Sequence, residues 1–79
     1  EYFAVFPNPT RNEFSIQASK AKFPATIELF DVTGRRIHHE LIGQNNSVIS
    51  VETQESGVYF ICLKDSNSKD FRSKVVISR

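Results

Sequence analysis

The side chains most suited to chemistry in this sequence are two adjacent histidines, His38 and His39, and a single cysteine, Cys62. Imidazole and thiolate groups bind metal ions and act in catalysis. The histidines fall in an extended run, where neighbouring side chains point to opposite faces, so we expect that they do not share a metal ion. Cys62 lies in an apolar run, which favours a buried and unreactive thiol. A lone cysteine forms no internal disulfide and does not decide the redox compartment.

The other patterns that carry catalysis or phosphate binding are missing. No serine lies in a Gly-x-Ser-x-Gly turn, and the three glycines do not form a phosphate-binding loop. The carboxylates are scattered singly over predicted turns and outward strand positions. The pair Arg35-Arg36 is interpreted as the solvated start of a strand rather than as an anion site. The sequence therefore predicts no catalytic, cofactor-binding or metal-binding residues.

Length and charge point to a single small domain covering residues 1–79. Ten Lys and Arg residues against nine Asp and Glu residues give a net charge of +1, which predicts no nucleic-acid partner. No apolar run is long enough to span a membrane. The absence of methionine leads us to expect a processed piece or an excised domain.

The elements that must position any functional residue are short strands. Runs rich in β-branched and aromatic residues recur at intervals of about ten residues and are separated by turn residues, which predicts an all-β sandwich. The predicted strands are 2–6, 13–18, 25–30, 35–42, 47–51, 57–64 and 71–77. The strand 57–64 is the most apolar and is expected to lie centrally. The inward positions of these runs predict a core of Phe14, Ile16, Ile27, Leu29, Ile49, Val51, Tyr59, Ile61, Leu63, Val75 and Ile77.

Proline, glycine and tyrosine give the clearest local signals. Pro7 and Pro9 end the first strand and are expected to leave an unpaired edge beside it. Asp31 suits the start of a type I turn, and Gly34 suits a left-handed position that closes a hairpin with a bulge. Gly57 also permits backbone conformations closed to other residues. A buried Tyr59 hydroxyl would need a hydrogen-bond partner.

The segment 71–77 alternates apolar residues with Arg72 and Lys74, which the alternation places outward. It runs to the last residue of the sequence, Arg79. Such a strand is either the closing strand of a sheet or a signal that other proteins read. Lysine and arginine on an edge strand also oppose self-association.

Three pieces of sequence, taken in order, carry a family resemblance. They are 5–10 (Val-Phe-Pro-Asn-Pro-Thr), 27–35 (Ile-Glu-Leu-Phe-Asp-Val-Thr-Gly-Arg), and 56–61 (Ser-Gly-Val-Tyr-Phe-Ile) with the final 74–79. Together they closely resemble the type A C-terminal sorting domain of cargo proteins of the type IX secretion system. The resemblance covers essentially the whole chain. One departure is local: Gln54-Glu55 stands where the family often has a Leu-Pro-like dipeptide.

The resemblance implies a seven-stranded, Ig-like antiparallel β-sandwich that is itself non-catalytic. It implies export into the periplasm and then passage of an upstream cargo protein across the outer membrane to the cell surface. The implied partners are the outer-membrane translocon and shuttle of the type IX machinery, and a cell-surface sortase that usually removes the domain. A strand edge can be read by β-addition. The implied signal residues are Lys74, Val75, Val76, Ile77, Ser78 and Arg79, and the implied structural motifs are Pro7, Asn8, Pro9, Gly34, Gly57 and Tyr59.

Two other functions compete with a secretion signal. An accessory β-sandwich could bind carbohydrate or space other domains of a surface protein. A sugar site needs exposed aromatic rings, but tryptophan is absent and most phenylalanines are predicted to point inward. An enzyme is the third possibility, and no constellation of residues favours it.

Overall fold

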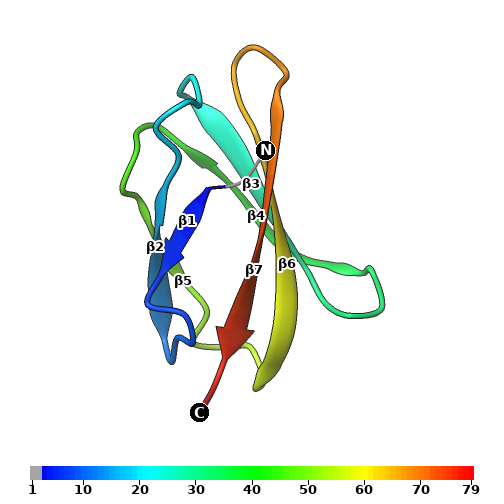
Figure 1. Ribbon diagram of the computed structural model, residues 1–79. Helices are drawn as coiled ribbons and strands as arrows, with labels where there is room; N and C mark the ends of the chain where they lie inside the picture. The colour runs from blue at the N-terminus through cyan, green and yellow to red at the C-terminus, as the bar shows by residue number, and fades with distance from the viewer. Residues whose placement is uncertain (1–2) are drawn as a thin grey trace.

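Seven short strands account for the regular structure of residues 3–79, the part of the chain that the computed structural model describes (Figure 1). Each strand coincides with a predicted alternating or apolar run. Their bounds are β1 Ala4–Phe6, β2 Glu13–Gln17, β3 Ala25–Phe30, β4 Arg36–Ile42, β5 Val48–Ser50, β6 Gly57–Lys64 and β7 Asp70–Ile77. Within the described residues, no helix is long and apolar enough to cross a membrane.

The strands form two facing antiparallel sheets, which confirms the predicted all-β sandwich. One sheet has the order β1-β2-β5 and the other the order β4-β3-β6-β7. Strand β6 lies inside the larger sheet, as predicted, and β7 pairs with it from Gly57 opposite Ile77 to Lys64 opposite Asp70. Figure 1 shows the three-stranded sheet on one side, with β7 at the near edge of the other sheet beside β1.

Side chains from both sheets fill one core. All eleven residues predicted for it are buried, and Tyr59, at 7%, is the most exposed of them. The structure adds Phe71 to this set, at 1% exposed. The remaining additions are Phe3, Ala18, Ala21, Ala25 and Ile42.

Strand ends differ from the prediction by a residue or so where loops take over the backbone hydrogen bonds. The N–H of Ala18 donates to Asn45 Oδ1 at 2.8 Å, so β2 ends at Gln17. The N–H of Val51 donates to the carbonyl of Asn12 at 2.7 Å, beyond the end of β5. Tyr2, which the sequence places in the first strand, lies outside the described residues.

The hairpin between β3 and β4 has the predicted turn. Gly34 has a φ of +87° and donates its N–H to the carbonyl of Asp31 at 3.0 Å. The Asp31 carboxylate accepts the N–H groups of Thr33 and Arg35 at 2.9 and 3.1 Å. The pairing register shifts between Leu29 and Phe30, which is the bulge that a glycine at this position predicts.

Replacing Gly34 with valine should lower the free energy of unfolding by about 1–3 kcal/mol, because a β-branched residue is strained at positive φ. The added Cβ would meet nothing within 4 Å, so the loss isolates backbone strain. Gly43→Val is the matched control, since a Cβ there also meets nothing and the φ of Gly43 lies outside the left-handed range. Urea denaturation of both variants gives the comparison. Equal stability of the two would contradict the turn assignment.

Candidate recognition surface

The six predicted signal residues divide between the core and the surface. Val75 and Ile77 point inward and are 0% and 1% exposed. Lys74 and Ser78 are exposed, and Val76 is half-buried on the outward face of the sheet. Only part of segment 74–79 is therefore available to a partner while the domain is folded.

The Pro7-Asn8-Pro9 segment lies against the outer edge of β7, so two motifs that are far apart in sequence form one structural unit. The Asn8 side chain donates from Nδ2 to the carbonyl of Lys74 at 3.0 Å, and its Oδ1 accepts the N–H of Val76 at 2.9 Å. A side-chain amide thus makes both hydrogen bonds that one residue of a neighbouring strand would make through its backbone N–H and C=O.

Thr10 continues this edge pairing. Its N–H donates to the carbonyl of Val76, and its carbonyl accepts the N–H of Ser78, both at 2.8 Å, in a parallel bridge to Ile77. The strand that Pro7 and Pro9 end, β1, pairs only with β2 among the described strands, so the expected unpaired edge lies beside β1, whereas the outer edge of β7 is occupied. The backbone of β7 from the Lys74 carbonyl onward is already hydrogen-bonded, so it is not free for β-addition.

Arg79 joins the end of β7 to two loops. Its guanidinium donates to the carbonyls of Val51 and Gln54, the latter at 2.7 Å, and to Asn12 Oδ1 at 3.1 Å. Its backbone N–H donates to the hydroxyl oxygen of Ser56 at 3.0 Å. Although the residue is exposed, its charged group is engaged within the domain rather than presented to a partner.

Gly57 and Tyr59 fix the loop that Arg79 contacts. The Tyr59 hydroxyl donates to the carbonyl of Glu55 at 2.7 Å, which confirms that this buried ring finds a partner. Gly57 begins β6 with a φ of +157°, and a Cβ there would lie 3.8 Å from the Tyr59 ring. Both residues therefore shape the loop that leads into β6.

Asp65 is a structural residue that the sequence analysis missed, since it was treated as one of several polar turn residues. It is 5% exposed, and its carboxylate accepts the N–H groups of Lys22, Asn67 and Lys69, each at 2.9 Å. These bonds, with that from Lys22 the strongest, hold the pKa of Asp65 below its ordinary value, although partial burial acts in the opposite direction. The carboxylate ties the β6–β7 turn to the loop before β3. An aspartate at the first position of a turn was the available sequence signal.

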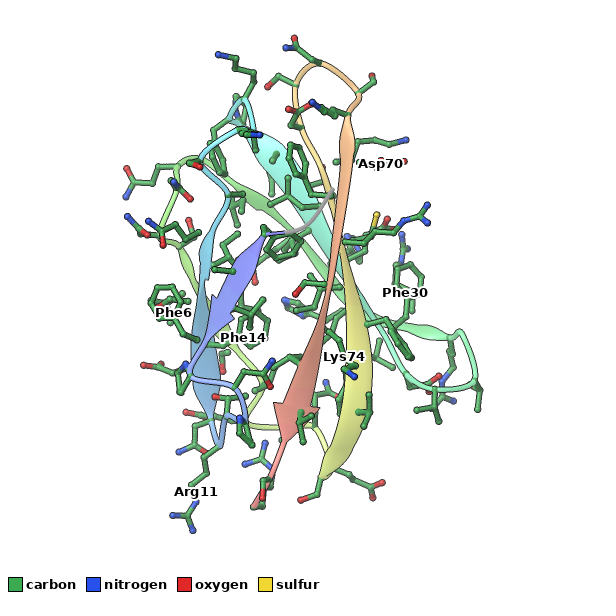
Figure 2. The ribbon with its side chains drawn as sticks, in the orientation of Figure 1. Phe6, Arg11, Phe14, Phe30, Asp70 and Lys74 are labelled. Carbon is green, nitrogen blue, oxygen red and sulfur yellow. The ribbon has the colours of Figure 1, made fainter. Side chains whose placement is uncertain are left out.

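The outward face of the larger sheet carries aromatic and cationic side chains in rows. Four phenylalanines lie in or against the core, as most were predicted to do, but Phe30 is only half-buried and Phe60 is 47% exposed. Phe30 pairs with Phe60, and Phe60 with Lys74, across neighbouring strands. Figure 2 shows Phe30 projecting away from the side on which the core residue Phe14 lies. The next row places Cys62 beside Arg72.

Charges on this face are unevenly compensated. Arg36 Nη1 lies 3.0 Å from Glu28 Oε2, so these two side chains form an ion pair. Among residues 3–79, no ion pair involves Arg72 or Lys74, and both are exposed as the alternation predicted. These two cations are thus available to a partner.

Cys62 lies half-buried on this face, so the expectation that it is buried is wrong. Partial desolvation, reinforced by Asp70 and Glu28 and opposed by Arg72, raises the pKa of the thiol. The histidines diverge as predicted: His39 is exposed on this outward face, while His38 Nε2 lies 2.7 Å from Glu40 Oε1. Within residues 3–79 no group of three metal-ligating side chains comes together.

A protein-family profile described as a secretion system C-terminal sorting domain matches residues 4–78. The chain belongs to this family. The sorting domain is therefore a secretion signal of the type IX system, acting in export toward the outer membrane or cell surface, and this role is favoured over an accessory module. No curated protein matches the chain.

A solved structure supports the fold. The sorting domain is similar to part of PorZ, described as an essential bacterial surface component of the type IX secretion system of Porphyromonas gingivalis. The TM-score is 0.73 at 20% sequence identity. The match covers 98% of this chain but 11% of the PorZ chain, so it extends over one part of that protein.

Asn8→Ala should lower the free energy of unfolding of the sorting domain by about 1–3 kcal/mol, because two hydrogen bonds of about 0.5–1.5 kcal/mol each are lost. Amide hydrogen exchange at Val76 should accelerate by more than the global loss of stability explains. Asn67→Ala is the control, since the Asn67 side chain lies in an exposed turn. Unchanged exchange at Val76 in Asn8→Ala would show that Asn8 does not hold this edge.

Stability should decline in acid through Asp65 and Asp31. The pKa of Asp31 is also below its ordinary value, chiefly because the Thr33 hydroxyl donates to it. Since both carboxylates have a lower pKa folded than unfolded, they stabilise the fold above about pH 4, and this contribution is lost as the pH falls through the folded values.

Asp65→Asn tests this directly, because an amide cannot accept from all three N–H groups. The variant should melt at a lower temperature at pH 7 and lose less stability than the parent between about pH 4 and pH 2. Melting curves at both ends of this range measure the effect. A variant that keeps the full acid dependence of the parent would contradict the role of Asp65.

Proposed function

We propose that the signal is the folded domain, residues 1–79, and that the type IX translocon and shuttle read the outward face of β7. This face presents Arg72, Lys74 and Val76. The upstream cargo and the sorting domain would meet this machinery in the periplasm, and a cell-surface sortase would act after translocation. The domain itself would have no catalytic role, as is general for sorting domains.

One observation carries this proposal: segment 74–79 is incorporated into the sandwich. Val75 and Ile77 are buried, Asn8 and Thr10 occupy the outer backbone edge, and the Arg79 guanidinium is bound to loop carbonyls. A partner that read these residues as a linear sequence would first have to unfold the domain. A partner that reads the folded surface instead meets two exposed cations, Arg72 and Lys74, on one face.

Reversing both charges, in Arg72→Glu/Lys74→Glu, tests the proposal with the fold retained. Changes to exposed residues usually alter stability by less than about 0.5 kcal/mol, so the melting temperature should stay near that of the parent. Cargo fused to the variant should accumulate in the periplasm, with at least a tenfold loss at the cell surface and in the medium. Cell fractionation with immunodetection of the cargo gives the measurement.

The matched control reverses Arg11 and Lys20, which are also exposed but lie outside β7, and so changes the net charge equally. This control should be secreted like the parent. Deletion of Lys74 to Arg79 should also retain the cargo in the periplasm, but it removes part of β7 as well. Normal secretion of the Arg72→Glu/Lys74→Glu variant would refute the proposal that the machinery recognises this face. An equal secretion defect in the control would show that net charge, not this face, causes the loss.

A further inference from the structure

Two adjoining depressions lie on the outward face of the larger sheet, along β6 and β7. One, of about 330 Å³, is lined by Phe30, Phe60, Ile61, Cys62, Arg72 and Ser73. The other, of about 480 Å³, is lined by Phe60, Arg72, Ser73 and Lys74. Because Phe60, Arg72 and Ser73 belong to both, the depressions form one continuous feature, here called the β6–β7 groove.

The floor of the β6–β7 groove is apolar. Phe60, which lines both depressions, is 47% exposed. Beyond the groove, on the same two strands, Val58 is 36% exposed and lies directly opposite the half-buried Val76. Phe30 extends this surface onto β3, where it pairs with Phe60. Adjacent exposed apolar side chains with a polar rim are characteristic of contact surfaces.

The rim of the groove is cationic on the β7 side. Arg72 and Lys74 lie two residues apart on one strand, so their side chains leave the same face about 7 Å apart. The carboxylate of Glu28 is engaged by Arg36. Asp70 lies two residues from Arg72 on the same face and directly opposite Lys64. Positive charge therefore still exceeds negative charge on this face.

We propose that the β6–β7 groove binds an extended, acidic segment of a protein partner. Carboxylates on alternate residues would face Arg72 and Lys74, because the spacing of side chains on one face of an extended chain is the same as that of these two cations. The intervening apolar side chains leave the opposite side of the segment and would lie over β6 and β3, against Phe60 and Phe30. This inference rests on the proposed recognition of β7 by the secretion machinery, and it adds the chemical nature of the segment that binds.

Over the second half of β7, a partner can make contact only through side chains on the face, because the backbone edge is occupied. Asn8 and Thr10 already bond the outer backbone edge from the Lys74 carbonyl to the Ser78 N–H. A partner beside this half of β7 finds no ladder to extend, so its affinity comes from the apolar floor and the two cations. A contact of this size is weak, with a dissociation constant on the order of 100 µM, and is suited to a transient encounter.

An NMR titration of the ¹⁵N-labelled domain tests the groove with two defined probes. The first is a capped hexapeptide of alternating glutamate and valine, and the second is its counterpart of alternating lysine and valine. The acidic peptide should shift the amide signals of residues 58–62 and 72–76, and its affinity should fall at higher salt. The basic peptide should shift none of them.

Variants of the domain locate the contact. Phe60→Ser and Arg72→Glu/Lys74→Glu should each weaken acidic-peptide binding at least fivefold, whereas Phe60→Tyr should retain it. Leu41→Ser is the matched control, because Leu41 is 72% exposed on the same outward face but lies on β4. Melting temperatures show which variants remain folded, and only folded ones are compared.

Equal binding of the two peptides, shifts outside the groove, or full binding by folded Phe60→Ser would overturn the inference. Cargo secretion separates this failure from failure of the proposed function. If cargo fused to Phe60→Ser is secreted normally while cargo fused to the charge-reversed β7 variant is not, the proposal that β7 is recognised stands and the proposal of a binding groove fails. If both secrete normally, both proposals are wrong.

Discussion

Strand β7 is hydrogen-bonded along one edge to β6 and, over its second half, along the other edge to residues 8–10. Its inward side chains Phe71, Val75 and Ile77 fill the core between the sheets. Strand β7 therefore contacts the N-terminal segment, the central strand β6 and the core at the same time. A domain of this size buries a modest fraction of its unfolded surface, so few other contacts can replace these.

This double pairing has a consequence for the signal. The residues proposed as the signal, 74–79, are also residues that close the sandwich, so the proposed recognition and the folding depend on the same segment. Alternation along the strand separates the two roles in space: Phe71, Val75 and Ile77 pack inward, whereas Arg72 and Lys74 face solvent. The exposed side chains of β7 cover a small area. The aromatic rings beside them come from the neighbouring strands β3 and β6.

Several charged and polar side chains act within the fold rather than on a partner. Arg79 bonds loop carbonyls, Asp65 gathers three N–H groups, and Asp31 organises the β3–β4 turn. Each satisfies backbone groups that loops would otherwise leave unpaired, which is a recurring need where short strands alternate with many turns. Arg72 and Lys74, by contrast, are exposed and lie together on one face.

Alternation of apolar and polar residues was enough to predict the seven strands, the facing of their side chains and the core, because these depend on the local period of the chain. The turn at Gly34 was predictable for the same reason, since its requirement for positive φ is local. The bonds of Asn8 to Lys74 and Val76 join residues 66 and 68 positions apart, and nothing in the local pattern indicates them. The pairing of Phe30 with Phe60, and the place of Cys62 outside the core, follow from strand order and register. Strand order and register depend on how all the strands pack at once, so only the tertiary structure decided the closed edge of β7 and the groove beside it.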